Sequence, residues 1–348
     1  MRKHFPFVPS LSKHAVSFYE LWCNGIILLL LLLGFSIVLA PDVRAQDLKP
    51  IRISLSLGSA QLPLWAAREA GLFAKHGLNA ELLGLQAAAR QVQLLLAGDS
   101  IAASLSATTP VRARMEGADT TIIMGLLNSF TLSVITVPEI KRPSDLKGKL
   151  IGVGSLGGSP TLLTQRLLKK WGIEQDVKFL GTGGYIESVA ALEKRRVHAA
   201  VLDPPRAYIG KKKFGFVELA NLGQEFKYAT TVITVREALV KKDRELFVQF
   251  GKGVIEGIHR VKTDREFAIK ILGKMLRSSD REILEETYRV FSALYERTPY
   301  PTLEGLQPIL DEIAGQVPKA KNYKPEDFVD NSIVRQLEQS GFIASVYR

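Results

Sequence analysis

The feature that most constrains the fold is a regular alternation of short apolar runs with longer amphipathic segments. From Pro50 onward, runs such as 51–57, 101–107 and 150–155 are each followed by a turn rich in Gly, Ser or Thr and then by apolar residues at helical spacing. Strands that alternate with helices are typical of parallel sheets, because a parallel connection needs a crossover. The sequence therefore predicts an α/β fold.

The clearest of these units lies at 150–172. Its apolar run ends in the turn GSLGGSP, where Ser159 and Pro160 are favourable residues for the start of a helix. An apolar residue then recurs every fourth position, and Gly172 suits the left-handed position that ends a helix. The free N–H groups at the start of this helix would suit an anion or a polar oxygen. Turns of this kind also serve packing alone, so the ligand interpretation depends on the other turns.

Two strand–helix series of similar size follow one another, and a polar segment with two prolines, 138–149, separates them. We expect that segment to cross between two lobes. After Val235 the sequence shows only helical patterns. Helices are predicted at 241–262, 264–276, 280–295, 302–314 and 331–340.

These patterns predict two lobes joined by two crossings, near 130–140 and 224–234, with the C-terminal helices packed on the first lobe. The predicted segments are 46–136 for the first part of lobe one, 137–228 for lobe two, and 229–348 for the second part of lobe one with the C-terminal helices. Ligands of open α/β sheets bind beyond the carboxyl ends of the strands. Two lobes that face each other in this way would form a cleft.

Residues 1–45 have the pattern of a cleaved secretory signal peptide. A basic start precedes an uninterrupted apolar run at 25–40, and Val43 and Ala45 occupy the small-residue positions of a cleavage site. The alternative is an uncleaved anchor, but a helix of this length spans about 24 Å, less than the ~30 Å hydrocarbon core. The sequence therefore predicts export to the periplasm.

Composition excludes several classes of function. The only cysteine, Cys23, lies within the predicted signal, so the exported chain would have neither thiol catalysis nor disulfides nor cysteine metal sites. The formal net charge is +11, but the visible basic clusters, 211–213 and 319–324, have few aromatic residues among them. That pattern favours a solvated surface over a nucleic-acid partner.

The sequence shows no catalytic constellation. It lacks a P-loop, a GxSxG elbow and a convincing dinucleotide fingerprint. The histidines beyond the predicted signal, His76, His198 and His259, have no metal-like spacing. We therefore expect no enzyme activity, no metal and no cofactor.

Five predicted strand-to-helix turns are rich in Ser, Thr, Gly and Gln and nearly free of charge. This composition suits a small polar or anionic ligand held by neutral hydrogen bonds and backbone N–H groups. Asp203 and Arg206 are the charged exceptions; they either contact the ligand or pair with each other, and pairing is the simpler interpretation. The five turns are 58–63, 106–110, 154–160, 181–184 and 202–206, and the predicted ligand-binding residues in them include Leu62, Gly157, Thr182 and Asp203.

Three segments resemble one family of proteins. IRISLSLGSAQLPLWAAREAGLFAKHGLNAELLGL (51–85) resembles the opening of periplasmic substrate-binding proteins of nitrate/sulfonate/taurine-type ABC transporters. DLKGKLIGVGSLGGSPTLLTQRLLKKWGI (145–173) is similar to the entry to their second lobe, and VAALEKRRVHAAVLDPP (189–205) to a later segment. Arg196 and His198 depart from the Gly and Asp that are common in the family.

The resemblance implies a two-lobed, type II periplasmic-binding-protein fold of the Venus-flytrap kind, without catalysis. It also implies that the ligand-binding residues include Ser59, Gln61, Thr108, Thr109, Ser155, Gly158 and Ser159. It also implies that the protein is a monomer and that its partner is an ABC permease in the inner membrane. The same superfamily contains thiamine-pyrimidine-precursor synthases. Two alternatives therefore stay open: an enzyme on the same scaffold, of the pyrimidine-precursor or menaquinone-pathway type, and a periplasmic ligand sensor.

Overall fold

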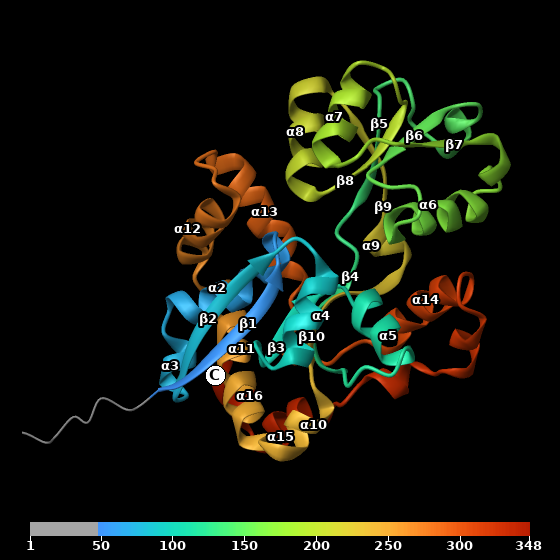
Figure 1. The fold of residues 1–348 in the computed structure, drawn as a ribbon. Coiled ribbons are helices and arrows are strands. Elements are labelled where there is room, and N and C mark those ends of the chain that lie inside the picture. Colours follow the sequence, from blue (N-terminus) through green and yellow to red (C-terminus); the bar gives the residue numbers. More distant parts are fainter. Residues whose placement is uncertain (1–47) are drawn as a thin grey trace, which may run out of the picture. The chain divides into compact units, whose positions relative to one another are not determined.

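The computed structural model describes residues 48–348, and the predicted signal peptide lies outside them. Within that range the chain forms two five-stranded β-sheets with helices packed against them (Figure 1). This arrangement confirms the predicted two-lobed α/β fold. No helix of residues 48–348 combines the length and apolar character needed to cross a membrane.

The first sheet has the strand order β2-β1-β3-β10-β4. Strand β10 runs antiparallel to both of its neighbours, whereas β1 pairs in parallel with β2 and β3. The strands are β1 (Lys49–Ser56), β2 (Leu78–Leu85), β3 (Ala102–Leu105), β4 (Thr121–Ser129) and β10 (Lys227–Val235).

The second sheet repeats this pattern with the order β7-β6-β8-β5-β9. Here β5 is the strand that runs antiparallel to both neighbours. The strands are β5 (Ser133–Thr136), β6 (Leu150–Val153), β7 (Lys178–Gly181), β8 (Ala199–Leu202) and β9 (Val217–Asn221). Strand β5 directly follows the first crossing between the lobes, and β10 directly follows the second.

In each lobe, helices connect consecutive strands, as the alternating pattern predicts. In the first lobe these connections are η1 (Ser59–Gln61), α2 (Leu62–Glu69), α3 (Leu72–Lys75), α4 (Ala88–Ala97) and α5 (Thr108–Met115). In the second lobe they are η2 (Pro143–Leu146), α6 (Ser159–Lys170), η3 (Glu174–Asp176), α7 (Tyr185–Glu193) and α8 (Pro204–Phe214), and α9 (Leu222–Glu225) leads out of it.

The C-terminal helices follow the prediction closely. The main ones are α11 (Arg244–Thr263), α12 (Arg265–Leu276), α13 (Arg281–Leu294), α14 (Leu303–Ala314) and α15 (Ser332–Gln339). Shorter elements accompany them: α10 (Glu237–Lys242), η4 (Pro318–Asn322), η5 (Pro325–Phe328) and α16 (Phe342–Val346). Asp243, Asp264 and Asp280 each accept a hydrogen bond from a backbone N–H three residues on, which fixes where α11, α12 and α13 begin.

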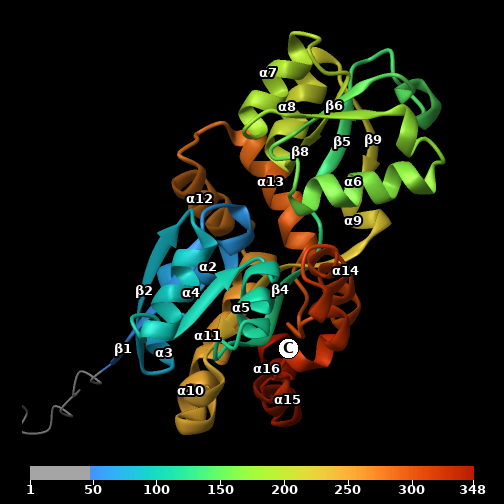
Figure 2. The same ribbon diagram turned by 45° about the vertical axis from the view of Figure 1, so that its right-hand side comes forward.

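Helix α11 lies against α2 beneath the first sheet (Figure 2). The approach is so close that a Cβ at Gly257 would overlap the carbonyl oxygen of Pro63. Val254, Ile255 and Ile258 are fully buried in the same core. Burial of a side chain of this size contributes about 1.5–3 kcal/mol. The C-terminal helices thus stabilise the first lobe, as the sequence predicts.

The first crossing between the lobes lies at the start of the predicted range 130–140 and not in the polar segment 138–149. Strand β5 pairs with β8 and β9, so Ser133–Thr136 already belong to the second sheet and the chain crosses at 130–132. The polar segment 138–149, which we expected to cross, is part of the second lobe and contains η2. The boundary predicted after residue 136 is therefore a few residues late. An apolar strand pattern indicates burial but not which of two sheets the strand joins.

The return crossing, 222–226, lies directly beside the outgoing one. The N–H of Leu222 donates to the carbonyl oxygen of Leu132 (2.9 Å), and Ser129 Oγ donates to that of Gly223 (3.0 Å). A Cβ at Gly223 would overlap the carbonyl oxygen of Phe130. Only glycine allows this approach, so the two crossings form one narrow, hydrogen-bonded connection between the lobes.

Candidate functional site

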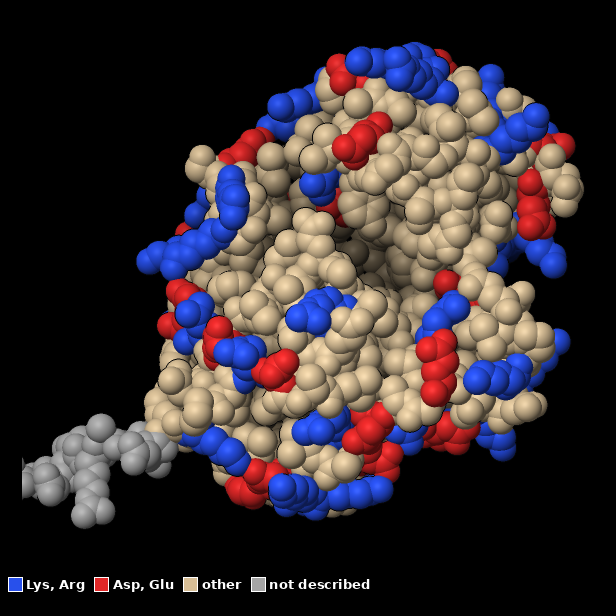
Figure 3. Space-filling view, viewed as in Figure 1, with Lys and Arg blue, Asp and Glu red and all other residues tan. Residues whose placement is uncertain are grey.

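The carboxyl ends of the parallel strands in each sheet carry the Ser-, Thr- and Gly-rich turns. Figure 3 shows a hollow between the two lobes whose visible walls have few charged side chains. The turns lie after β1 and β3 in the first lobe and after β6, β7 and β8 in the second. The structure therefore gathers the predicted site residues at one edge of each sheet, where ligands of α/β proteins bind.

In the first lobe, the turn after β1 is held from within. Gly58 has a φ of 134°, a conformation that favours glycine. Ser59 is buried, and its carbonyl oxygen accepts a hydrogen bond from the hydroxyl of Tyr295 at 3.0 Å. The backbone of this turn is thus fixed against α13.

Gln61 and Leu62 point into the first lobe. The side-chain amide of Gln61 makes two hydrogen bonds with Ser104. Gln61 Nε2 donates to the Ser104 carbonyl oxygen (3.3 Å), and Ser104 Oγ donates to Gln61 Oε1 (2.6 Å). Leu62 is fully buried in the core beneath the sheet. Their contacts position the turn, and a ligand contact by either residue stays a prediction.

Helix α5 begins at the second predicted turn of this lobe. Thr108 and Thr109 are half-buried at its first two positions. Thr108 Oγ1 lies 3.3 Å from the hydroxyl of Tyr228, which comes from β10. Thr108 thus reaches the crossing between the lobes.

In the second lobe, the turn 154–158 projects outward. Ser155 and Gly157 are exposed, and Gly158 precedes the first residue of α6. The carbonyl oxygen of Ser155 accepts a hydrogen bond from Thr161 Oγ1 at 2.6 Å, which ties the turn to its helix. Ser155 Oγ makes no hydrogen bond within residues 48–348, and a Cβ at Gly158 would lie 2.9 Å from it, so the hydroxyl lies beside the start of α6.

The neighbouring turn, 182–184, lies side by side with 154–158. The N–H groups of Thr182 and Gly183 donate to the carbonyl oxygens of Val153 (2.8 Å) and Gly154 (3.1 Å). Thr182 Oγ1 also bonds to the Val153 carbonyl oxygen (2.9 Å) and lies 2.6 Å from Ser188 Oγ. Thr182 therefore joins the two turns, and its hydroxyl is already engaged.

Asp203 and Arg206 form the ion pair that the sequence suggests, through Arg206 Nη1 and Asp203 Oδ2. Burial raises the pKa of Asp203, and the Arg206 guanidinium offsets part of that effect. The Tyr185 ring centre lies 6.0 Å from the guanidinium carbon of Arg206. Burial raises the pKa of the Tyr185 hydroxyl to about 12. Asp203 Oδ1 is buried and accepts no hydrogen bond from the described residues.

Two residues absent from the predicted set complete the site. The hydroxyl of the buried Tyr228 donates to Ser159 Oγ (2.7 Å) and lies 3.2 Å from Glu312 Oε2. Ser159 Oγ lies 3.4 Å from Glu312 Oε1. Burial, and then the Glu312 charge, raise the pKa of Tyr228 to about 12. The start of α6, the start of β10 and helix α14 thus meet in one network.

No local signal in the sequence reveals this network, because its members are far apart along the chain. Ser159 and Glu312 are 153 residues apart, and Tyr228 lies in a strand that reads as ordinary core. Further contacts join the lobes on either side. Arg166 of α6 lies 3.4 Å from Asp311 of α14, and Lys212 of α8 pairs with Glu282 of α13.

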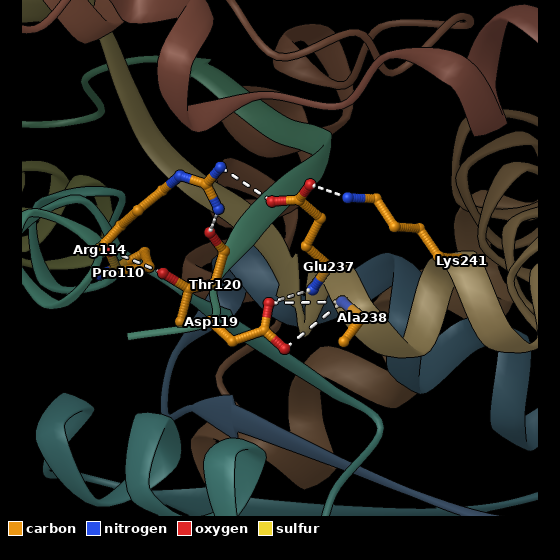
Figure 4. A network of polar contacts seen from close by, with 7 residues as sticks. All are labelled: Pro110, Arg114, Asp119, Thr120, Glu237, Ala238 and Lys241. Carbon is orange, nitrogen blue, oxygen red and sulfur yellow. Dashed lines mark hydrogen bonds and ion pairs between the residues drawn. The ribbon is translucent and has the colours of Figure 1, made fainter. Parts of the chain in front are cut away.

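A second hollow, an open cavity of about 840 Å³, lies at the opposite edge of the first sheet, near the start of β4. Arg114 and Glu237 line it, and they belong to the network in Figure 4. Arg114 Nη2 donates to Glu237 (2.9 Å), and Asp119 accepts from the N–H groups of Glu237 and Ala238. Hydrogen bonds from Lys241 and Arg114 lower the pKa of Glu237. This network fixes the start of α10 and joins it to α5, which is a structural role.

Within residues 48–348 no group of three or more His, Cys, Asp or Glu side chains is arranged to hold a metal ion. The polar groups at the cleft turns are hydroxyls, backbone groups, the carboxylates of Glu187, Asp203 and Glu312, and the Arg206 guanidinium. Such an arrangement can bind a small organic molecule through hydrogen bonds.

Comparison with known proteins gives one family and many structures of the same fold. The family model described as NMT1/THI5 like matches residues 59–266, more than half of the chain. No curated protein sequence matches.

Three solved structures illustrate the similarity in fold. The periplasmic aliphatic sulphonate binding protein SsuA from Escherichia coli is 16% identical, with a TM-score of 0.62, over 83% of this chain and 96% of that one. A ligand-binding component of an ABC-type import system from Staphylococcus aureus is 15% identical (TM-score 0.64; 82% and 98% covered). The periplasmic nitrate-binding protein NrtA from Synechocystis PCC 6803 is 12% identical (TM-score 0.59; 84% and 89% covered).

Proposed function

The chain belongs to the NMT1/THI5-like family, and we propose that it is an exported solute-binding protein of an ABC-type import system. It captures a small polar or anionic organic ligand between its lobes in the periplasm, as a monomer, and delivers the ligand to a permease in the inner membrane. The solute-binding proteins among the structures of the same fold support this role.

Closure of the lobes about the paired crossings is the proposed mechanism. Ligand contacts from both lobes exist together only in the closed form, so binding shifts the equilibrium toward that form. The crossings at 130–132 and 222–226 are short and lie side by side, which suits a hinge. Ser155, Ser159 and Thr109 would supply hydroxyl groups from the two sides.

The observation that carries this proposal is the contact among Thr108, Tyr228 and Ser159. It brings together, within hydrogen-bonding distance, the start of α5 in the first lobe, the start of β10 just after the return crossing, and the start of α6 in the second lobe. The predicted ligand-facing turns of both lobes therefore lie around one point. An α/β enzyme would need an acid–base or nucleophilic set there, and the residues at this point supply hydroxyls and the carboxylate of Glu312, which is hydrogen-bonded to Tyr228 and Ser159.

A thermal-shift screen combined with small-angle scattering tests the proposal. A ligand present at 100 times its Kd should stabilise the protein by about 2.7 kcal/mol and reduce its radius of gyration. The double variant Ser155→Leu, Ser159→Leu should remove both effects, because the new side chains fill the turn. The matched control is Ser345→Leu, an exposed position on α16. A folded protein that binds no small molecule and never becomes more compact would refute the proposal, and turnover of a bound compound would favour an enzyme.

A further inference from the structure

Three helices of the second lobe, those that follow β6, β7 and β8, have a carboxylate of this chain at their N-termini. Glu312 lies at the first residue of α6, where Ser159 Oγ is 3.4 Å from Oε1. Glu187 folds back over the start of α7, so that a Cβ at Gly184 would lie 2.5 Å from its Oε2. Asp203 directly precedes α8. The positive ends of these three helices are therefore already neutralised from within the protein.

Basic side chains do not compensate for these carboxylates. The turns 58–63, 106–110, 154–160 and 181–184 contain no Lys or Arg. Arg206 is the basic residue at this edge of the second sheet, and it is paired with Asp203. An anionic ligand would thus meet three carboxylates and one guanidinium that is already engaged. Like charges at close range are unfavourable, and more so when closure of the lobes excludes water.

Exposed apolar side chains concentrate at the same edges. Among the described residues, five large apolar side chains are exposed, and four of them lie on or beside the cleft turns. These four are Leu57 (60% exposed), Leu156 (59%), Leu180 (40%) and Ile186 (66%). The fifth, Leu96 (37%), lies on α4.

The leucines lie over glycines that make room for them. A Cβ at Gly84 would lie 2.7 Å from Leu57 Cδ2, and one at Gly181 would lie 3.5 Å from Leu156 Cγ. Single exposed apolar residues are common on protein surfaces. Their concentration at the edges of both sheets indicates apolar surface that leaves water when the lobes close on a ligand.

We propose that the ligand has an alkyl or aryl body and a neutral or positively charged polar group, and that oxyanions are poor ligands. This inference rests on the proposed function and narrows it. The body packs between Leu57 of the first lobe and Leu156 and Ile186 of the second. The polar group donates hydrogen bonds to the Ser and Thr hydroxyls and to the exposed carboxylate of Glu187, whereas Asp203 Oδ1 is buried.

A set of ligands with one body and three head charges tests the inference. Calorimetric titration of the protein with hexylammonium, hexan-1-ol and hexane-1-sulfonate compares the affinities for three head groups on the same hexyl chain. Titration with methylammonium, compared with hexylammonium, measures the contribution of the apolar body. We expect the first two compounds to bind at least about tenfold more tightly than the sulfonate, a difference of about 1.4 kcal/mol. Methylammonium should bind more weakly than hexylammonium, because it lacks the apolar body.

Two pairs of variants separate charge from apolar contact. Glu312→Gln removes one carboxylate and should reduce the preference for hexylammonium over hexane-1-sulfonate about three- to tenfold. Its control is Glu304→Gln, an exposed position at the other end of the same helix. Leu156→Ser should weaken all three hexyl compounds alike, and Leu96→Ser should leave their affinities unchanged.

The outcomes distinguish this inference from the function on which it rests. Tighter binding of hexane-1-sulfonate or of nitrate than of the other compounds, with compaction in scattering, overturns the inference and leaves the solute-binding function standing. Equal affinity for the methyl and hexyl compounds overturns the apolar half of the inference. If none of these compounds binds while the thermal-shift screen finds another ligand, the inference is overturned and the solute-binding function stands. The absence of a ligand in both experiments counts against the proposed function itself.

Discussion

The cleft turns of the two lobes differ in how they are held. In the first lobe, Gln61 and Leu62 are turned inward, and the Ser59 backbone is fixed by a buried tyrosine. In the second lobe, Ser155 and Leu156 are exposed on a turn whose backbone alone is bonded. The first lobe therefore offers a rigid surface, and the second presents side chains that are free to contact a ligand. Similar turn sequences serve different purposes because one lobe also carries the C-terminal helices.

The largest expected effect comes from paired leucine substitutions, one in each lobe. Leu62→Ala should lower the free energy of unfolding by about 2–5 kcal/mol, because it leaves a cavity in a closed core. Leu156→Ala should change it by at most about 0.5 kcal/mol, because the side chain is already exposed. Urea denaturation followed by circular dichroism measures both. Equal losses for the two variants would contradict the contrast between a rigid and an exposed turn.

A smaller effect is expected from the hydrogen bonds of the inward-facing turn. Gln61→Ala leaves the Ser104 hydroxyl and carbonyl group without their partner in a buried site, which should cost about 1–3 kcal/mol. The exposed Gln93→Ala on α4 is the matched control. If the two variants were equally stable in urea denaturation, the Gln61 side chain would not be fixed as described.

The smallest loss of stability at pH 7 is expected from a change in the network that joins the lobes, and this contribution depends on pH. Tyr228 has a pKa of about 12 in the folded protein, against 10.0 in the unfolded chain. The unfolded state therefore loses its proton first, and stability that is present below pH 10 is lost as the pH rises toward 12. The loss is about 1.4 kcal/mol per pH unit for this group. Tyr228→Phe should be less stable by about 0.5–1.5 kcal/mol at pH 7 and should lose less stability above pH 10. Parallel alkaline profiles for the two proteins would show that the hydroxyl is not buried.

Much of the fold follows from patterns within short segments of the sequence. The alternation of strands and helices and the five C-terminal helices depend on local spacing and capping residues. Helix α6 begins beside Pro160 as predicted, but its N-cap residue is Gly158 and not Ser159, whose hydroxyl is bonded to Tyr228. The ion pair of Asp203 with Arg206 is similarly local, since one helical turn separates the two residues. The placement of β5 was beyond such patterns, because its four residues are buried in whichever sheet they join.

The sequence by itself determined the elements of this protein, its two-lobed class and the chemical character of the turns that border the cleft. Helix propensity, capping and apolar periodicity act over a few residues, so they can be read without the fold. Only the tertiary structure decided that Tyr228 and Glu312 meet Ser159 and that the two crossings lie side by side. Those contacts join residues up to 153 positions apart, and they form only when the whole chain has packed.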